Sequence, residues 1–490
     1  MSSTPAPRRL PRLCVVSVAL ALAVVAGACA TSLDIIVVAS DNNPPNAREP
    51  DAATTTEPAP TVEGQPTATP APELQPELAY DDAIDVYFAD VERFWTDAAP
   101  DLLGLVFEPV QERIPYDPEG ATIPACDGEV GPRELYGGNA FYCEPDDYIA
   151  WDDEQLFPDL YNVYGDFTVG LVIAHEYAHA VQARAAVDGP TIVLELQADC
   201  LAGAWARSVS DGPAVAIPFE RADLDNAIGG FLTFADPLGT IAADPGAHGT
   251  AFDRLNAFAE GFERGVAVCL EYVQSPPQTA SILIDVRDSN EGNLPLDALL
   301  PLLIEDLGMF LNETGELLTG AAFDAPDQLV EFGGALGDPP PCGGVAIDTD
   351  TLEGSAYLCE ADNTVYADRT ALDDLFFEVG DFAPSYAVAH SFAVGVAAKL
   401  ESDPTAAVLA ADCLVGVWAR DVFDEAAEGP LEPTHVLILS AGDLDEGIVG
   451  LLLAPPTGAS LAELAPITTF DRVASFGSGF FRGTDDCGFG

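Results

Sequence analysis

Apolar residues recur at helical spacing in several stretches of the chain. In residues 82–98 they stand three or four positions apart, which predicts an amphipathic helix with an apolar face made of Val86, Tyr87, Val91, Phe94 and Trp95. Residues 299–311 have a similar pattern and predict a second helix of the same kind. A short apolar run at residues 148–151, flanked by acidic residues, predicts a strand at the edge of a sheet. The patterns therefore predict a mainly helical protein with some strand.

Residues 166–207 predict two successive helices with an unusual set of polar side chains. Asp166 is placed to cap the first helix, and Val169, Val172 and Ile173 are placed to face the core. The second helix is expected from about residue 194 onward.

The first of these helices contains a His-Glu-x-x-His motif, formed by His175, Glu176 and His179. Positions i and i+4 lie on one helix face, so both imidazoles can bind one metal ion. Glu176 is placed to take a proton from a water activated by that ion. In the second helix Glu195 is expected as the third ligand, and Asp199 as the carboxylate that orients a ligand histidine. Two histidines, one carboxylate and one open position describe a catalytic zinc site.

The spacing of the histidines carries this prediction. The chain has 5 histidines among 490 residues, so a chance pair at this spacing around a glutamate is rare. The alternative is a polar helix face with two solvated histidines.

The segments HEYAHAVQ and ELQADCLAGAWA resemble the bacterial putative neutral zinc metallopeptidase family, whose members carry HEYGHHVQ-like and ELQADCxAGxWA-like segments. The resemblance covers about residues 80–270. It implies a zincin-like α+β fold, mainly helical with a small sheet, and zinc-dependent hydrolysis of a peptide or protein substrate. Ala178 and Ala180 stand where the family tends to have Gly and His, and neither is a ligand position. The resemblance implies the zinc ligands His175, His179 and Glu195 and the general base Glu176.

His248 is a further candidate, in the segment His248-Gly249-Thr250. An HGS-like segment occupies this region in the resembling family. We expect His248 to donate a hydrogen bond to the oxyanion of the tetrahedral intermediate. The alternative is a residue at a helix start with no catalytic role.

The composition excludes one class of partner. The chain has 18 Lys and Arg against 81 Asp and Glu, a formal net charge of −63. Binding of phosphate backbones needs a basic surface, so nucleic acid is not an expected partner.

The front of the chain predicts export. Residues 1–29 have a positive start with Arg8, Arg9 and Arg12, and then an apolar run that is short for a membrane span. Ala26-Gly27-Ala28-Cys29 resembles a bacterial lipobox, so Cys29 is a candidate for lipidation and membrane anchoring. The alternative is cleavage after residue 30 and free secretion. Residues 30–78, rich in Pro, Thr, Ala and Glu, predict a flexible tether.

The remaining chain predicts an internal duplication. Eight cysteines form two sets of four with spacings of 17, 57 and 69 residues and of 17, 54 and 74 residues. Local sequence agrees, since Ala-Asp-Cys-Leu recurs at 198–201 and 411–414, and Phe-Asp-Arg recurs at 252–254 and 470–472.

The cysteines of each set allow three pairings. An exported protein can form disulfides, and free buried thiols are the alternative. Zinc binding by cysteine does not fit, because the chain has no C-x-x-C. The preferred pairs are Cys126–Cys143, Cys200–Cys269, Cys342–Cys359 and Cys413–Cys487.

The second copy lacks most of the candidate chemistry. Ser391 stands in place of the base, Val394 in place of the second histidine and Val408 in place of the carboxylate ligand, while His390 and Asp412 remain. Pro466 aligns with the position of His248. One zinc ion per chain is therefore expected, in the first copy only.

This comparison predicts a zinc metallopeptidase domain at residues 79–275, a linker at 276–297 and a degenerate copy without zinc ligands at 298–490. A rival reading is a non-catalytic cell-surface binding protein whose metal site is structural or vestigial. The natural substrate, the cleavage preference, the role of the second copy and the oligomeric state stay open.

Overall fold

The computed structural model describes residues 78–212, 217–243, 247–282, 292–326, 328–347, 354–428, 435–453 and 467–489. The targeting segment 1–29 with Cys29, the tether up to residue 77, and Pro466 lie outside these residues. The described chain is mainly helical with two small three-stranded sheets, which is consistent with the α+β class. None of the helices in the described ranges is both long and apolar enough to span a bilayer.

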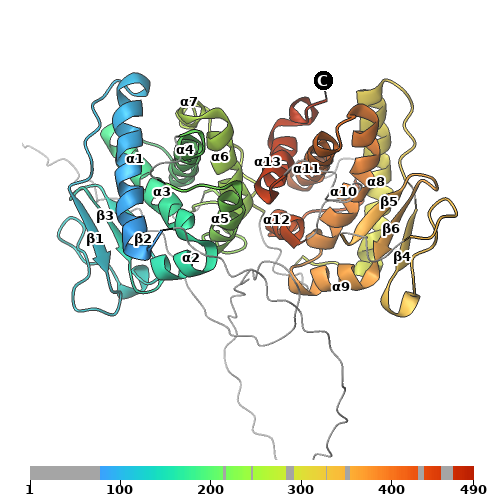
Figure 1. The fold of residues 1–490 in the computed structure, drawn as a ribbon, viewed down its shortest axis with the longest axis horizontal. Coiled ribbons are helices and arrows are strands. Elements are labelled where there is room, and N and C mark those ends of the chain that lie inside the picture. Colours follow the sequence, from blue (N-terminus) through green and yellow to red (C-terminus); the bar gives the residue numbers. More distant parts are fainter. Residues whose placement is uncertain are drawn as a thin grey trace, which may run out of the picture.

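The first half, residues 78–282, surrounds the long helix α3 with its other elements (Figure 1). Its elements are α1 (Tyr80–Leu102), β1 (Glu112–Tyr116), η1 (Arg133–Leu135), β2 (Ala140–Cys143), β3 (Tyr148–Asp152), α2 (Leu156–Tyr164), α3 (Asp166–Arg184), α4 (Thr191–Asp211), α5 (Arg221–Thr233), α6 (Ala251–Arg264) and α7 (Val266–Cys269).

The helix predicted at residues 82–98 is confirmed as α1. Its apolar face is buried and packs against α3, where a Cβ added at Gly170 would collide with the ring of Tyr87. The predicted capping role of Asp166 is wrong. Gly165, at φ 89°, is the N-cap residue, and Asp166 is the first helical residue and accepts a hydrogen bond from the Tyr87 hydroxyl at 2.9 Å.

The sheet of the first half has the order β1-β3-β2, with β1 parallel and β2 antiparallel to β3. The edge strand predicted at residues 148–151 is therefore wrong, because β3 is the middle strand. Its second neighbour β1 contains Pro115 and charged residues, and has no alternation that marks it as a strand in the sequence. The strand next to α3 is β2, an edge strand of this sheet whose residues are all buried.

The second half, residues 292–489, has a similar order of elements. They are α8 (Leu296–Thr319), β4 (Leu329–Phe332), η2 (Gly334–Leu336), β5 (Ala356–Cys359), β6 (Thr364–Asp368), α9 (Arg369–Glu378), α10 (Phe382–Leu400), α11 (Pro404–Glu428), α12 (Asp443–Leu453), α13 (Thr469–Arg482) and η5 (Thr484–Asp486). Its sheet has the order β4-β6-β5 with the same parallel and antiparallel pairings. The helix predicted at residues 299–311 is confirmed as α8.

Four disulfides form with the pairings preferred from the sequence: Cys126–Cys143, Cys200–Cys269, Cys342–Cys359 and Cys413–Cys487. The second of them joins α4 to α7, and the fourth joins α11 to the chain after α13. Each long-range disulfide thus holds a helix from the middle of its half to the end of that half.

Glycines let two pairs of helices touch backbone to backbone. A Cβ added at Gly203 on α4 would lie 2.9 Å from the carbonyl carbon of Phe258 on α6, and one at Gly261 on α6 would lie 2.7 Å from that of Cys200 on α4. Gly416 on α11 and Gly479 on α13 make the same kind of contact in the second half. Both helix pairs need glycine at these positions for so close an approach.

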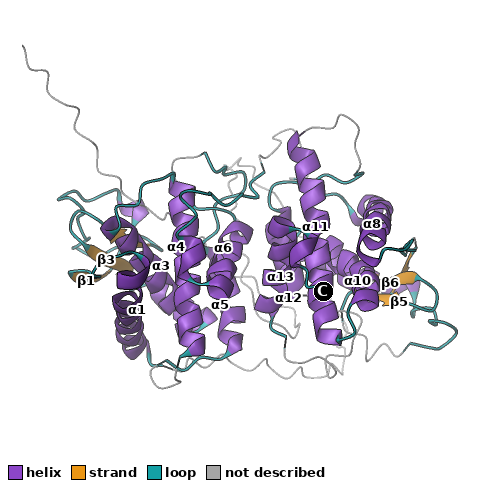
Figure 2. Cartoon of the chain, turned by 90° about the horizontal axis from the view of Figure 1, so that it is seen from above, coloured by secondary structure: helices purple, strands orange, loops and turns teal. Residues whose placement is uncertain are grey.

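The two halves meet through α6 and α13, with the sheets at the outer ends of the molecule (Figure 1). Figure 2 shows the same arrangement from above. The ring of Phe252 on α6 packs against the phenylalanine rings of α13, with its centroid 5.3 Å from that of Phe476 and 5.0 Å from that of Phe480. Phe470 on α13 packs in turn against Phe258, at 5.7 Å.

Candidate metal centre

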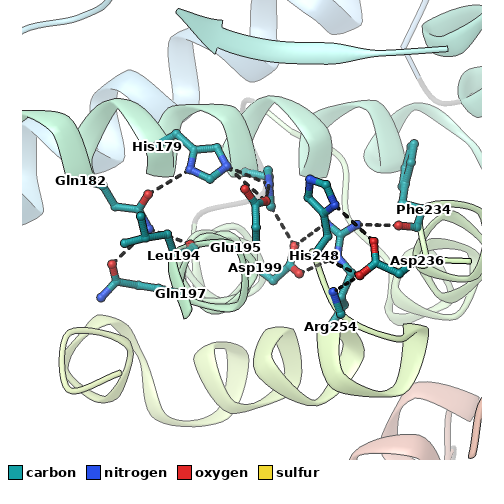
Figure 3. A network of polar contacts seen from close by, with 12 residues as sticks. His179, Gln182, Leu194, Glu195, Gln197, Asp199, Phe234, Asp236, His248 and Arg254 are labelled. Carbon is teal, nitrogen blue, oxygen red and sulfur yellow. Dashed lines mark hydrogen bonds and ion pairs between the residues drawn. The ribbon is translucent and has the colours of Figure 1, made fainter. Parts of the chain in front are cut away.

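Helices α3 and α4 bring together His175, His179 and Glu195. The two Nε2 atoms of the histidines are 3.1 Å apart, and Glu195 Oε2 lies 3.3 Å from that of His175 and 3.5 Å from that of His179. The histidines face the same way because they are four residues apart on α3. Figure 3 shows Glu195, on the neighbouring helix α4, turned toward His179.

This group fits a metal ion. All three side chains are buried, and the ligand atoms lie within 4.8 Å of one another. Among the described residues, neither carboxylate oxygen of Glu195 has a hydrogen-bond partner, although a buried carboxylate without one is costly. A cation between the three side chains removes that cost. Two imidazole nitrogens and one carboxylate oxygen are a ligand set that zinc takes in catalytic sites.

The other nitrogen of each imidazole is held by a hydrogen bond. His175 Nδ1 donates to Asp199 Oδ1 at 2.7 Å, and His179 Nδ1 donates to Gln182 Oε1 at 2.9 Å (Figure 3). Each Nε2 is thereby left as the nitrogen that can bind a metal. Asp199 thus lies next to His175, the candidate ligand that the sequence predicts it to orient.

Arg254 on α6 holds Asp199 in place. Its Nε donates to Asp199 Oδ2 at 2.8 Å, and its second terminal nitrogen donates to Oδ1 at 3.0 Å. Its remaining nitrogen donates to the carbonyl oxygen of Phe234 at 2.9 Å. Sequence reasoning missed this arginine, although its Phe-Asp-Arg segment is one of the repeated ones.

Gln182 was missed as well. Its amide nitrogen donates to the carbonyl oxygen of Leu194 at 2.7 Å and to Gln197 at 3.1 Å, so it connects α3 to the start of α4. A polar residue three positions after a ligand histidine on the same helix is the signal that could have identified it.

Electrostatics at the centre favour a positive charge among the ligands. Burial lowers the pKa of His175, but Asp199 and Glu195 outweigh burial and raise it to about 10. Burial also lowers the pKa of His179, but the nearby Glu195 carboxylate outweighs burial and raises this pKa. For Glu195 burial raises the pKa, but the two histidines hold it well below its usual value. A metal that binds here must displace imidazole protons, so binding is coupled to pH.

Glu176 lies on the same turn of α3 and is buried. Burial raises its pKa, against the opposing effect of the two histidines. Together with His175 it lines a small pocket with a cavity volume of about 40 Å³. The other lining residues are mostly apolar and come mainly from α3 and α5, among them Leu171, Val172, Ala227 and Phe231. Val172 thus faces the pocket and is partly exposed, whereas Val169 and Ile173 lie in the core as predicted.

His248 is buried near the group but is not one of the three clustered ligands. Its Nδ1 lies 3.2 Å from Asp236 Oδ1, and its backbone N–H donates to Asp236 Oδ2 at 2.7 Å (Figure 3). The backbone N–H of Gly249 donates to the same oxygen at 2.8 Å. Asp236, which sequence reasoning missed, therefore fixes both the loop and the ring of His248.

At the corresponding position in the second half, the counterparts of Arg254 and Asp199 are present, but the counterparts of His179 and Glu195 are not. Arg472 binds Asp412 at 3.0 Å, and His390 Nε2 lies 3.2 Å from the same carboxylate. Burial lowers the pKa of His390 to about 4, so its ring is neutral at physiological pH. The hydroxyl of Ser391 donates to the carbonyl oxygen of Ala387 within its own helix. Within the described residues of this half, no three-ligand group forms around His390.

A buried pair of histidines with a nearby carboxylate and an adjacent glutamate is an arrangement typical of zinc-dependent hydrolases. Comparison with known proteins agrees with this class. Residues 132–271 match the sequence profile of the family described as "Putative neutral zinc metallopeptidase". The resemblance drawn from the two motifs is thereby confirmed for this segment, and it supports a zinc peptidase at the level of the family.

Two similar proteins are described as uncharacterized. YpfJ of Escherichia coli K12 is 31% identical over 150 residues, which cover 26% of this chain and 50% of YpfJ. Rv2575 of Mycobacterium tuberculosis H37Rv is 30% identical over 164 residues, which cover 28% of this chain and 53% of Rv2575. The chain thus spans about half the length of the curated relatives it matches. No solved structure matches the chain.

Proposed function

We propose that the first half is an extracytoplasmic zinc-dependent metallopeptidase and that the second half is a degenerate, catalytically inactive copy of it. The observation that carries the proposal is the convergence of His175, His179 and Glu195 beside Glu176. Among the described residues no fourth ligand atom joins this cluster, which is consistent with a coordination position left for water and substrate.

When bound, zinc supplies Lewis-acid polarisation of the peptide carbonyl and lowers the pKa of a water molecule. The protein supplies the proton transfers. The Glu176 carboxylate takes a proton from the attacking water and passes it to the leaving nitrogen. Its raised pKa makes the carboxylate a stronger proton acceptor than an ordinary glutamate. Asp199 and Gln182 keep the two imidazoles in one orientation and one tautomer.

His248 is proposed to donate a hydrogen bond to the oxyanion that forms on the carbonyl oxygen. Because its Nδ1 faces Asp236, Nε2 is the nitrogen that can reach a substrate.

The pocket beside Glu176 indicates the substrate class. Its lining is mainly aliphatic and aromatic, and it opens next to the candidate ligand His175. We therefore expect peptides that place an apolar side chain adjacent to the bond that is cut.

Location and anchoring are proposed from the sequence. An exported chain agrees with four disulfides, since these persist in oxidising compartments. We propose attachment to the outer face of the cell membrane through Cys29, or free secretion if the chain is cut after residue 30.

The test is zinc content and hydrolysis of an unfolded protein substrate by the full chain and by its Glu176→Gln variant. Both proteins should hold about one zinc, as three protein ligands and water predict, and only the wild type should cut. A Ser391→Ala variant is the matched control, because Ser391 aligns with Glu176 in the second half and should leave the rate unchanged.

Two other results would each refute part of this proposal. If neither protein holds zinc, the ligand assignment is wrong. If both proteins hold zinc and neither hydrolyses the substrate, peptidase activity is refuted and the alternative of a cell-surface binding protein is favoured. The second half is an example of such a fold without this metal site, because its described residues include the Asp412–Arg472 pair and His390 but no group of three ligands around them.

A further inference from the structure

The N-terminus of α6 is completed by a residue from the other half of the chain. The first N–H groups of a helix have no partner within the helix. At α6 the N–H of Asp253 is capped by the hydroxyl of Thr250 at 3.1 Å. The preceding two N–H groups, of Ala251 and Phe252, donate to the Asp445 carboxylate on α12, at 3.3 Å and 2.8 Å.

The contact is reciprocal across the interface. The N–H of Phe470, on α13, donates to Asp225 of the first half at 2.7 Å. Asp225 and Asp445 stand at matching positions in the repeated Asp-Leu-Asp segments, and Phe252 and Phe470 match in the repeated Phe-Asp-Arg segments. Each half therefore caps the same helix of the other half with the same residue.

Among the described residues, only the contact at α6 is connected through further hydrogen bonds to a group of three candidate metal ligands. Arg254 lies on the first turn of α6, directly after the capped residues, and its guanidinium holds Asp199 through two hydrogen bonds. Asp199 in turn accepts from His175 at 2.7 Å. The loop that carries His248 ends where α6 begins. The position of the α6 N-terminus therefore affects both sides of the candidate centre.

We propose that Asp445 of the degenerate half is a positioning residue for the metal centre of the first half. Its carboxylate fixes the first turn of α6, and through it the Arg254–Asp199–His175 series of hydrogen bonds. This assigns the second half a role as an intramolecular support of the centre. The inference rests on the ligand assignment in the proposed function and does not depend on peptide hydrolysis.

Asp225 provides a matched control. It makes the same contact with α13. Arg472 on α13 holds Asp412, but no group of three candidate ligands lies beside that pair in the part of this half that the structure describes. Removing either aspartate weakens the same interface in the same way. An effect on zinc that follows only Asp445 therefore cannot come from loss of the interface alone.

The experiment compares zinc dissociation constants of the full chain and its variants, by competition with a chromophoric chelator. Asp445→Ala should weaken zinc binding about 5-fold, less than the roughly 10–100-fold loss seen when a ligand's own hydrogen-bond partner is removed. Asp445→Asn keeps one oxygen acceptor and should weaken zinc binding about 2-fold, an effect between those of the wild type and Asp445→Ala. Asp225→Ala and Asp225→Asn should bind zinc as the wild type does.

Thermal unfolding of the same variants separates the outcomes. Equal zinc affinity in the Asp445 and Asp225 variants, with equal losses of stability, would overturn the proposal and leave the contact as a structural link only. If Asp445→Ala does not fold, the comparison of the two Asn variants decides in the same way. If the wild type binds no zinc, the ligand assignment itself fails and this inference fails with it.

Discussion

The backbone contact between α4 and α6 makes a quantitative prediction for Gly261→Ala. The added Cβ would lie 2.7 Å from the carbonyl carbon of Cys200 and 3.1 Å from the amide nitrogen of Ala204, both on α4. The carbonyl oxygen of Cys200 would lie closer still. A relaxed carbon–carbon contact is about 3.5–4.0 Å, so the helices must separate by at least about 1 Å at this point. Overpacking of this kind costs about 1–3 kcal/mol, and the better helix propensity of alanine returns about 1 kcal/mol. The net loss of stability is then about 0–2 kcal/mol.

The larger expected effect is on the metal centre. Arg254 on α6 reaches Asp199 on α4 through hydrogen bonds of 2.8 Å and 3.0 Å. A separation of about 1 Å would stretch them to about 4 Å, outside hydrogen-bond range. Zinc affinity should then fall by about 10-fold, the lower end of the effect of losing an outer partner of a ligand.

Gly479→Ala is the control for this variant. Its Cβ would lie 2.7 Å from the carbonyl carbon of Cys413, so it strains α11 and α13 as Gly261→Ala strains α4 and α6. Thermal unfolding should show similar losses in both variants, and chelator competition should show weaker zinc binding only in Gly261→Ala. Unchanged zinc affinity in Gly261→Ala, or an equal change in Gly479→Ala, would refute the reasoning.

Three further predictions concern the outer partners, pH and the pocket. Asp199→Asn should weaken zinc binding about 10–100-fold in chelator competition, whereas Asp412→Asn, at the matching place in the second half, should not. Burial raises the pKa of Glu446 to about 8, so the folded chain keeps a proton that the unfolded chain releases above about pH 4.5. Stability should therefore fall as pH rises from about 5 to 8, by about 3–4 kcal/mol, and Glu446→Gln should flatten the profile of unfolding midpoints against pH. A steeper profile in that variant would contradict the assignment. Ala227→Leu should fill part of the pocket and lower kcat/KM about 10-fold for peptides with large apolar side chains, with peptides that carry alanine there as the unaffected control; equal losses for both would exclude the pocket as the specificity site.

The sequence predicted the parts of the structure that depend on local spacing. The His-Glu-x-x-His motif fixes the side of α3 that His175 and His179 share, and the two sets of cysteines gave the four disulfides. The strand order could not be obtained in this way. It depends on β1, whose Pro115 and adjacent charged residues Glu112 and Arg113 give no strand pattern, yet β1 pairs with β3 along its whole length.

The sequence failed to predict several site residues for the same physical reason, which is that their contacts are made between distant parts of the chain. Arg254 lies 55 residues from Asp199 and Asp236 lies 12 residues from His248, and only the fold brings these pairs into contact. Single residues of this kind carry no local signature. The sequence signal that could have identified Arg254 is the recurrence of Phe-Asp-Arg at 252–254 and 470–472 together with Ala-Asp-Cys-Leu at 198–201 and 411–414.

The interface between the halves limits which positions of the second half can change in sequence during evolution. Both partners belong to one chain, so docking is intramolecular and takes place at an effective concentration of about the millimolar range. A contact with a Kd near 1 mM, equivalent to about 4 kcal/mol, is then enough to keep the halves together for much of the time. Selection on the second half would therefore act on Asp445 and the phenylalanines of α13, and would be relaxed at Ser391 and Val394.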